Sequence, residues 1–177
     1  MNNQFELRLS GAGGQGLLLA GIVLAEAGIL DDKYAVQTQS YGPEARGGAS
    51  KSEVIISNAF IDYPEVRTPN LVLALSQEAA NKYLRTDMSN GIIVVDERVK
   101  ISEDVKYDRL IRVPIMKTAK NKVGKAIVAN IVSLGIIVEA TNVVSKESIE
   151  KAIMNRVPRG TEKLNRLALE SGYELAK

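Results

Sequence analysis

Cysteine and histidine are both missing from this chain of 177 residues. Without cysteine there can be no disulfide, no thiolate nucleophile and no thiolate-ligated iron–sulfur cluster. Without histidine the commonest zinc ligand and the usual acid–base group of neutral pH are absent. No paired spacing typical of a metal site or a general acid–base site connects the carboxylates Glu26, Glu44, Glu53, Asp62, Asp96 and Glu97. We therefore predict no catalytic residue and no metal site, so that redox or hydrolytic chemistry would need a borrowed cofactor or another chain.

Aromatic residues and an excess of one charge are scarce as well. The chain has 23 basic and 21 acidic residues and 5% aromatics, so nothing in its composition favours nucleic-acid binding. No apolar run reaches the roughly 18 residues of a membrane span, and the polar start Met1 to Gln4 does not resemble a secretory signal. We expect one cytoplasmic domain over residues 1–177 that binds neither nucleic acid nor membrane.

Short apolar segments alternate with helical ones along the chain. Strands are expected over residues 5–10, 34–39, 52–57, 70–76, 91–96 and 109–115. Helices are expected over residues 17–30, 77–86, 118–140, 146–155 and 161–170, the last closed by Gly172. The near-continuous apolar strands are typical of strands covered on both faces, which predicts an α/β fold with a three-layer, mainly parallel sheet and a helical C-terminal tail. Antiparallel pairing is the alternative for residues 37–57.

A glycine-rich turn joins the first expected strand to the first expected helix. Its ligand-binding candidates are Gly11, Gly13, Gly14, Gln15 and Gly16. Glycines at these positions allow a tight bend, close approach of backbone to an anion and close packing of helix on strand, which makes the turn a phosphate-loop candidate. NAD(P) or FAD binding is disfavoured because the next strand ends in Thr38-Gln39 rather than in a ribose-binding carboxylate. A turn that only packs the helix remains the structural alternative.

A second cluster follows the strand expected over residues 34–39. Its candidate binding residues are Tyr41, Gly42, Arg46, Gly47 and Gly48. The guanidinium of arginine is a planar fork suited to a carboxylate or phosphate. In a parallel sheet this loop would lie beside the glycine turn, at the carboxyl ends of the strands, where ligands usually bind. A tight turn with a solvated arginine is the alternative.

The segment expected to be helical over residues 118–140 contains Gly124 and Gly135. A glycine inside a helix costs about 1 kcal/mol relative to alanine, so either the helix is broken or another element packs very close to it. Residues 127–138 are apolar nearly all round, which is typical of a central buried helix or of a helix at a subunit interface.

Four motifs together resemble a known family. The glycine turn, the cluster Ser40 to Gly48, the step Tyr63-Pro64, and Ala129-Asn130 followed by Leu134-Gly135 occur in the order seen in gamma subunits of 2-oxoacid:ferredoxin oxidoreductases. The resemblance covers almost the whole chain, and the joint occurrence of the first two motifs is more specific than either alone.

This resemblance implies a subunit of an enzyme that decarboxylates a 2-oxoacid on thiamine diphosphate, passes electrons through iron–sulfur clusters to ferredoxin and forms an acyl-CoA. It implies alpha, beta and delta partner subunits, which would hold thiamine diphosphate, Mg and the clusters. The present chain would bind no cofactor by itself, would be inactive alone and would support assembly, with the glycine turn and the Arg46 loop contacting partner chains or coenzyme A. The first expectation for the substrate is 2-oxoglutarate, with pyruvate and branched-chain oxoacids open. A stand-alone nucleotide-binding domain is the alternative function.

Overall fold

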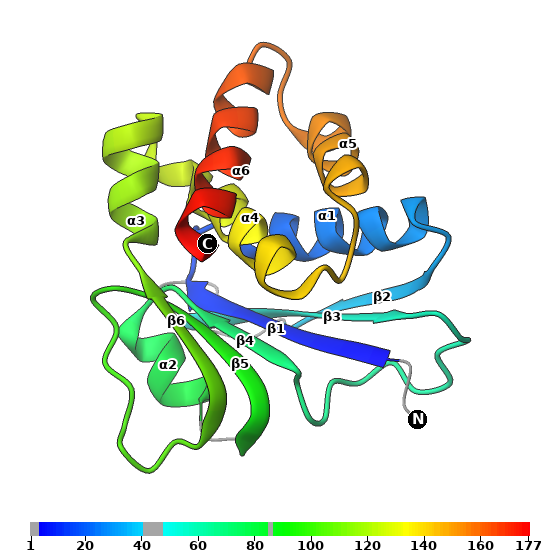
Figure 1. Cartoon of the computed structure of the whole chain (residues 1–177), viewed down its shortest axis with the longest axis vertical. Coiled ribbons are helices and arrows are strands. Elements are labelled where there is room, and N and C mark those ends of the chain that lie inside the picture. The colour runs from blue at the N-terminus through cyan, green and yellow to red at the C-terminus, as the bar shows by residue number, and fades with distance from the viewer. Residues whose placement is uncertain (1–3, 41–47, 85–86) are drawn as a thin grey trace.

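The computed structural model describes residues 4–40, 48–84 and 87–177, and its centre is a six-stranded sheet (Figure 1). In chain order the strands are β1 Gln4–Ala12, β2 Tyr34–Gln39, β3 Ala49–Ser57, β4 Leu71–Ala74, β5 Met88–Asp96 and β6 Tyr107–Val113. Their order across the sheet is β2-β3-β1-β4-β5-β6. The pairs β1–β4, β4–β5 and β5–β6 are parallel, whereas β3 is antiparallel to both β1 and β2. The mainly parallel sheet is confirmed, and of the residues 37–57 those described in β2 and β3 pair antiparallel, as the alternative predicted.

Helices cover both faces of this sheet. They are α1 Leu17–Leu30, α2 Gln77–Tyr83, α3 Ile115–Lys117, α4 Ala129–Thr141, α5 Lys146–Arg156 and α6 Glu162–Ala176, with η2 Thr118–Val123 and η3 Ala126–Val128 between α3 and α4. Figure 1 shows α1, α4, α5 and α6 on one face and α2 on the other, which confirms the three layers and the helical C-terminal tail. Among the described residues, no helix is long and apolar enough to cross a bilayer.

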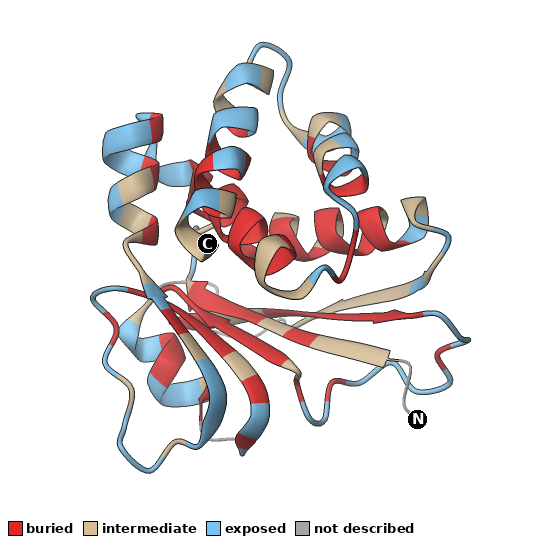
Figure 2. Ribbon diagram, viewed as in Figure 1, coloured by how far each residue is buried: buried red, intermediate tan, exposed pale blue. Residues whose placement is uncertain are grey.

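The strands β1, β3, β4 and β5 carry buried side chains, which alternate between the two faces of the sheet. In β4, Leu71 and Leu73 join the larger cluster beneath α1 and α4, while Val72 and Ala74 join the smaller cluster against α2. All four residues of this strand are fully buried, as expected from its unbroken apolar sequence (Figure 2). The two clusters make the sheet the common wall of two hydrophobic cores.

The segment expected to be helical over residues 118–140 is not a single helix, and the alternative of a broken helix is the one found. The chain forms α3 and a π-helical turn, η2, and then breaks at Gly124, whose φ of 97° lies in the left-handed region that favours glycine. Helix α4 starts only at Ala129. Its residues from Ala129 to Val138 are all buried within this chain, so the central-helix interpretation of the apolar run 127–138 is confirmed for them, whereas Ile127 is 69% exposed.

Helix α6 also differs from its expected end. It runs from Glu162 to Ala176 and therefore passes through Gly172 instead of stopping there. A Cβ atom placed on Gly172 would lie 2.1 Å from the carbonyl oxygen of Val132 in α4. Gly172 is thus a point of close contact between two helices rather than a helix terminator.

Candidate functional site

The glycine turn lies at the carboxyl end of β1, where the chain turns into α1. Gly14 and Gly16 have φ angles of 85° and 73°, which side chains with a Cβ rarely adopt. Gly13 and Gly14 are exposed. No side chain caps the first turn of α1, so its backbone N–H groups have no side-chain partner at this end. The N–H groups of Gly13 and Gln15 are used on the carbonyl oxygens of Gly48 and Ala12, so the donors left for an anion are those at the start of α1.

Gln15 folds back into the turn instead of pointing outward. Its side-chain Oε1 accepts a hydrogen bond of 2.7 Å from the backbone N–H of Ala12, and its Nε2 lies 3.8 Å from the sulfur of Met116. Gly11 makes room for this arrangement, because a Cβ at Gly11 would lie 2.3 Å from Oε1 of Gln15. Gly11 itself is buried within β1, so its observed role is packing beneath the turn.

Asn130, at the start of α4, supports the turn from the helix side. Its Nδ2 donates a hydrogen bond of 3.1 Å to the carbonyl oxygen of Gly16, and the residue is 4% exposed. A Cβ at Gly16 would lie 2.5 Å from this same nitrogen. Sequence reasoning placed Asn130 in a family motif without giving it a contact, since the partner lies 114 residues away in the chain.

Gly48, the last residue of the second candidate cluster, contacts the glycine turn. The N–H of Gly13 donates a hydrogen bond of 3.3 Å to the carbonyl oxygen of Gly48, and Ala49 pairs with Ala12 at the start of β3. This contact places Gly48 beside the glycine turn, as expected. Tyr41, Gly42, Arg46 and Gly47 lie outside the described residues.

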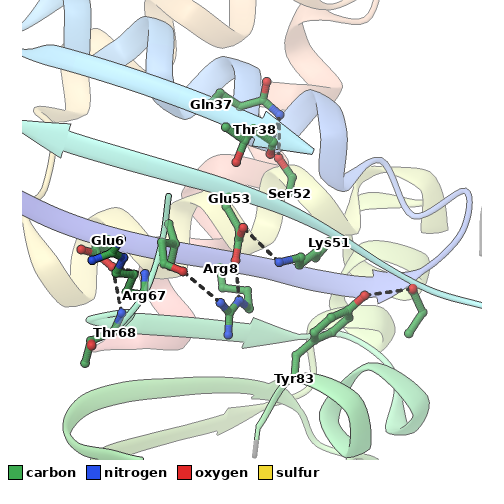
Figure 3. A network of polar contacts seen from close by, with 12 residues as sticks. Glu6, Arg8, Gln37, Thr38, Lys51, Ser52, Glu53, Arg67, Thr68 and Tyr83 are labelled. Carbon is green, nitrogen blue, oxygen red and sulfur yellow. Dashed lines mark hydrogen bonds and ion pairs between the residues drawn. The ribbon is translucent and has the colours of Figure 1, made fainter. Parts of the chain in front are cut away.

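A network of polar contacts holds β3, the strand that begins directly after Gly48, against its neighbours (Figure 3). The carboxylate of Glu53 forms ion pairs with Arg8, whose Nε lies 2.6 Å away, and with Lys51, whose Nζ lies 3.0 Å away. The hydroxyl of Tyr83 in α2 donates a hydrogen bond of 3.2 Å to the carbonyl oxygen of Ala49. The Glu53 and Arg8 side chains are 9% and 12% exposed, so this ion pair is shielded from water and holds β1 and β3 in register below the turn.

A buried carboxylate anchors the neighbouring segment at the same edge of the sheet. Asp96, at the end of β5, is fully buried and accepts hydrogen bonds from Nε of Arg98 at 2.6 Å and from the backbone N–H of Met116 at 2.8 Å. The second bond fixes the start of α3. Because Met116 also contacts Gln15, α3 is held against the glycine turn.

Other polar residues lie away from this edge. Tyr63 stacks under the guanidinium of Arg67 at 4.1 Å, and the N–H of Arg67 bonds to Glu6 near the beginning of β1. The loop that contains Asp62, Tyr63 and Pro64 therefore lies at the opposite end of β1 from the turn, and not beside it. Within the described part of the chain, no three acidic side chains gather as metal ligands.

The sheet topology also differs from that of a dinucleotide-binding domain. There the strand after the first helix pairs in parallel with the first strand. Here α1 leads to β2 at the edge of the sheet, and the antiparallel β3 lies between β2 and β1. The geometry instead describes an α/β domain whose exposed glycine turn forms part of a composite edge built from β1, β3, α3 and α4.

Comparison with known proteins identifies this type of domain. Residues 6–175 match the family described as Pyruvate ferredoxin/flavodoxin oxidoreductase. The chain is 51% identical to the 2-oxoglutarate synthase subunit KorC of Methanocaldococcus jannaschii, with 97% of this chain and 94% of that protein covered. The structure of a keto/oxoacid ferredoxin oxidoreductase gamma subunit from Geobacter sulfurreducens is similar with a TM-score of 0.88 and 50% identity, covering 98% and 96% of the two chains.

A larger enzyme contains the same fold. The 2-oxoglutarate:ferredoxin oxidoreductase from Magnetococcus marinus, solved with 2-oxoglutarate, coenzyme A and succinyl-CoA bound, matches with a TM-score of 0.88 at 18% identity. The match covers 99% of the present chain and 31% of that one, so the present fold corresponds to one part of a longer polypeptide there. The chain belongs to the pyruvate ferredoxin/flavodoxin oxidoreductase family. The resemblance to gamma subunits of 2-oxoacid:ferredoxin oxidoreductases is confirmed.

Proposed function

We propose that this chain is the gamma subunit of a cytoplasmic, multi-subunit 2-oxoacid:ferredoxin oxidoreductase that converts 2-oxoglutarate and coenzyme A to an acyl-CoA. The observation that carries the proposal is the end-to-end match to a 2-oxoglutarate synthase subunit and to a gamma-subunit structure, each covering more than nine-tenths of both chains. Pyruvate and branched-chain 2-oxoacids are the competing substrates.

The composition of the chain supports a division of labour with alpha, beta and delta partners. Iron–sulfur clusters need thiolate ligands, and this chain has no cysteine, so the clusters would reside on other chains. Thiamine diphosphate, held with Mg by the partners, would supply the electron sink for decarboxylation. The contribution of this chain would be assembly and the positioning of coenzyme A.

The glycine turn supports contact with the phosphates of coenzyme A. Gly14 is exposed, and the first turn of α1 has no side-chain cap, so the backbone N–H groups at the start of this helix are available to an anion. Gly48 bonds to Gly13, which brings the end of the Arg46 loop to the same place. We propose that the guanidinium of Arg46 adds a bidentate phosphate contact. The competing assignment is contact with a partner chain only.

The experiment that tests the enzyme role is anaerobic purification of the tagged chain from its native host, followed by assay of oxoacid-dependent and CoA-dependent viologen reduction. Co-purification of thiamine-binding and cluster-bearing chains with this activity is expected, with 2-oxoglutarate as the preferred oxoacid. A chain that purifies alone and inactive would refute the proposal. In that case, stabilisation by NAD, FAD or CoA in a thermal-shift scan would support the stand-alone binding domain.

Arg46→Ala tests the local assignment within the assembled enzyme. Loss of a charge-assisted hydrogen bond worth about 1.5–3 kcal/mol should raise the KM for coenzyme A roughly ten-fold to a hundred-fold while the subunits stay together. Arg159→Ala is the control, because Arg159 is an exposed arginine in the loop between α5 and α6. Unchanged assembly together with an unchanged KM for coenzyme A would refute the role of Arg46.

A further inference from the structure

A long stretch without acidic residues follows the last strand into α4. Residues 109–138 contain six basic residues and no aspartate or glutamate, although the whole chain has a net charge of only +2. Four of the basic residues lie on α3, η2 and the turn to η3, namely Lys117, Lys120, Lys122 and Lys125. We call residues 117–127 the lysine segment. The overall composition conceals this local charge, because the acidic residues are placed elsewhere.

The lysine segment is exposed and is mostly not neutralised within the chain. Its four lysines are all exposed, and Lys122 pairs with Glu174 of α6. In the described part of the chain, Lys117, Lys120 and Lys125 have no acidic partner. Figure 2 shows the outer side of this helical segment as exposed and the side towards the C-terminal helices as buried. The segment thus presents a cationic surface to solvent, while Ala119 and Val123 are buried beneath it.

An exposed apolar side chain lies at the C-terminal end of the lysine segment. Ile127 is 69% exposed, and it follows Lys125 by two residues. A single exposed isoleucine is ordinary, but this one lies beside Lys125 in the chain, and protein interfaces combine an apolar centre with a polar rim. Leu18, in the first turn of α1 next to the glycine turn, is a second exposed aliphatic residue at 44%.

The conformation of the segment is held firmly. Asp96 and Gln15 fix Met116 at its beginning, and Asn130 fixes α4 just beyond its end. Between these points the chain forms the π-helical turn η2, a feature found frequently at functional sites. A rigid surface binds a partner with a small loss of conformational entropy.

We infer that the lysine segment is a docking surface for an acidic chain of the same enzyme, one that presents carboxylates around an apolar pocket for Ile127. This inference rests on the proposed function. The charge is spread over nine residues of sequence from Lys117 to Lys125 rather than gathered round one cradle, which fits a protein surface better than a single phosphate group. A phosphate also gains nothing from Ile127. A protein interface of standard size covers about 800 Å² on each partner, so it would extend from the segment to the neighbouring glycine turn and Leu18.

The test uses the complete enzyme with two matched triple variants of this chain. Lys117→Glu, Lys120→Glu and Lys125→Glu are combined in one, and Lys100→Glu, Lys151→Glu and Lys163→Glu in the other. All six lysines are exposed, and each set changes the formal net charge from +2 to −4, so that long-range charge effects are matched. The readout is the retention of the other subunits on the tagged chain between 0.1 and 0.5 M salt, at about the concentrations where exposed charges are progressively screened.

The lysine-segment variant is expected to bind the remaining subunits at least ten-fold more weakly, while the control variant assembles like the natural chain. Lys→Gln at the same three positions should give an intermediate loss, and Ile127→Ser should weaken assembly without changing its salt dependence. Circular dichroism of each isolated chain establishes that it is folded, and the Gln and Ser variants decide the question if the Glu variant is not.

Normal assembly of all these variants would overturn the inference. Normal assembly with a raised KM for coenzyme A would also overturn it and would assign the lysines to phosphate binding. Neither result would contradict the proposed function, which is tested separately by the activity that purifies with the natural chain.

Discussion

Gly135 of α4 and Gly172 of α6 face each other where the two helices cross. A Cβ at Gly135 would lie 2.3 Å from the carbonyl oxygen of Leu169 and 2.9 Å from Cα of Gly172, and no flexible side chain is there to move away. Helix α4 also carries Asn130, which supports the glycine turn. The contact between the glycines therefore holds the helical layer in the position that the candidate site needs.

Gly135→Ala and Gly172→Ala should each lower the free energy of unfolding by about 2 kcal/mol. Alanine gains about 1 kcal/mol of helix propensity over glycine, but overpacking against backbone typically costs about 1–3 kcal/mol and here the clash is with main-chain atoms. Gly28→Ala is the matched control, because its Cβ would lie 3.4 Å from the nearest side-chain atoms of Ile56. Urea unfolding should show Gly28→Ala to be neutral or stabilising. A Gly135→Ala protein with the natural midpoint would contradict the close crossing.

The glycines of the turn should differ in their response to alanine. At Gly14 nothing lies within 4 Å of the added Cβ, so only the left-handed backbone is unfavourable, at about 1–2 kcal/mol. At Gly16 the same strain is joined by the collision with Asn130, so Gly16→Ala should cost about 1 kcal/mol more than Gly14→Ala.

A double-mutant cycle tests whether Asn130 is the cause. In an Asn130→Ala background the collision is absent, so the cost of Gly16→Ala should fall to that of Gly14→Ala, and the coupling between positions 16 and 130 should be about 1 kcal/mol. The measurement is the unfolding free energy of the four proteins. Additive effects would show that the two residues do not interact as described.

Asp31, at the end of α1, ties the start of α5 to the helical layer. Its carboxylate accepts hydrogen bonds of 2.6 Å from the hydroxyls of Ser145 and Ser148 and from the N–H of Ser145. Desolvation by burial raises the pKa of Asp31, but the hydrogen bonds from Ser145 and Ser148 outweigh it and leave the pKa below the ordinary value of 3.8. The ionised carboxylate is therefore the form that stabilises the fold.

The pH dependence of stability follows from this lowered pKa. The contribution of Asp31 is fully present above the unfolded-state value and is lost as the pH falls through that value to the lower folded-state pKa. Asp31→Ala should cost about 1–2 kcal/mol at pH 7, and its difference from the natural protein should shrink below pH 4. Unfolding at both pH values, with the exposed Asp62→Ala as the control, measures this. A difference that does not change with pH would contradict the lowered pKa.

Several features of the site could be read from local sequence. The turn Gly11 to Gly16 is recognisable because its spacing lies between a strand and a helix pattern, and both elements form as expected. The helix expected from residue 146 also forms, and the hydroxyl of Ser145 caps it by accepting a bond from the N–H of Ser148. Such signals depend on neighbours within a few residues, which the sequence displays directly.

Other features depend on contacts between distant segments. The carbonyl oxygen of the turn residue Gly16 accepts a hydrogen bond from Asn130. The lysine segment is positioned through Met116, which contacts Asp96 and Gln15. Gly172 was expected to end a helix, because the pattern of one helix does not reveal that another crosses it. These contacts could not be predicted, because the residues that form them lie far apart in the sequence.

By itself, then, the sequence determined the α/β class, the glycine turn, the absence of cysteine and histidine chemistry and the resemblance to the gamma subunits. Propensity, periodicity and composition are local quantities, and they suffice for those conclusions. Only the tertiary structure decided that β3 separates β2 from β1, that Gly124 breaks the long helix and that Gly135 packs on Gly172. Those outcomes depend on which surfaces meet in space, because burial and close packing are properties of the assembled core rather than of any one segment.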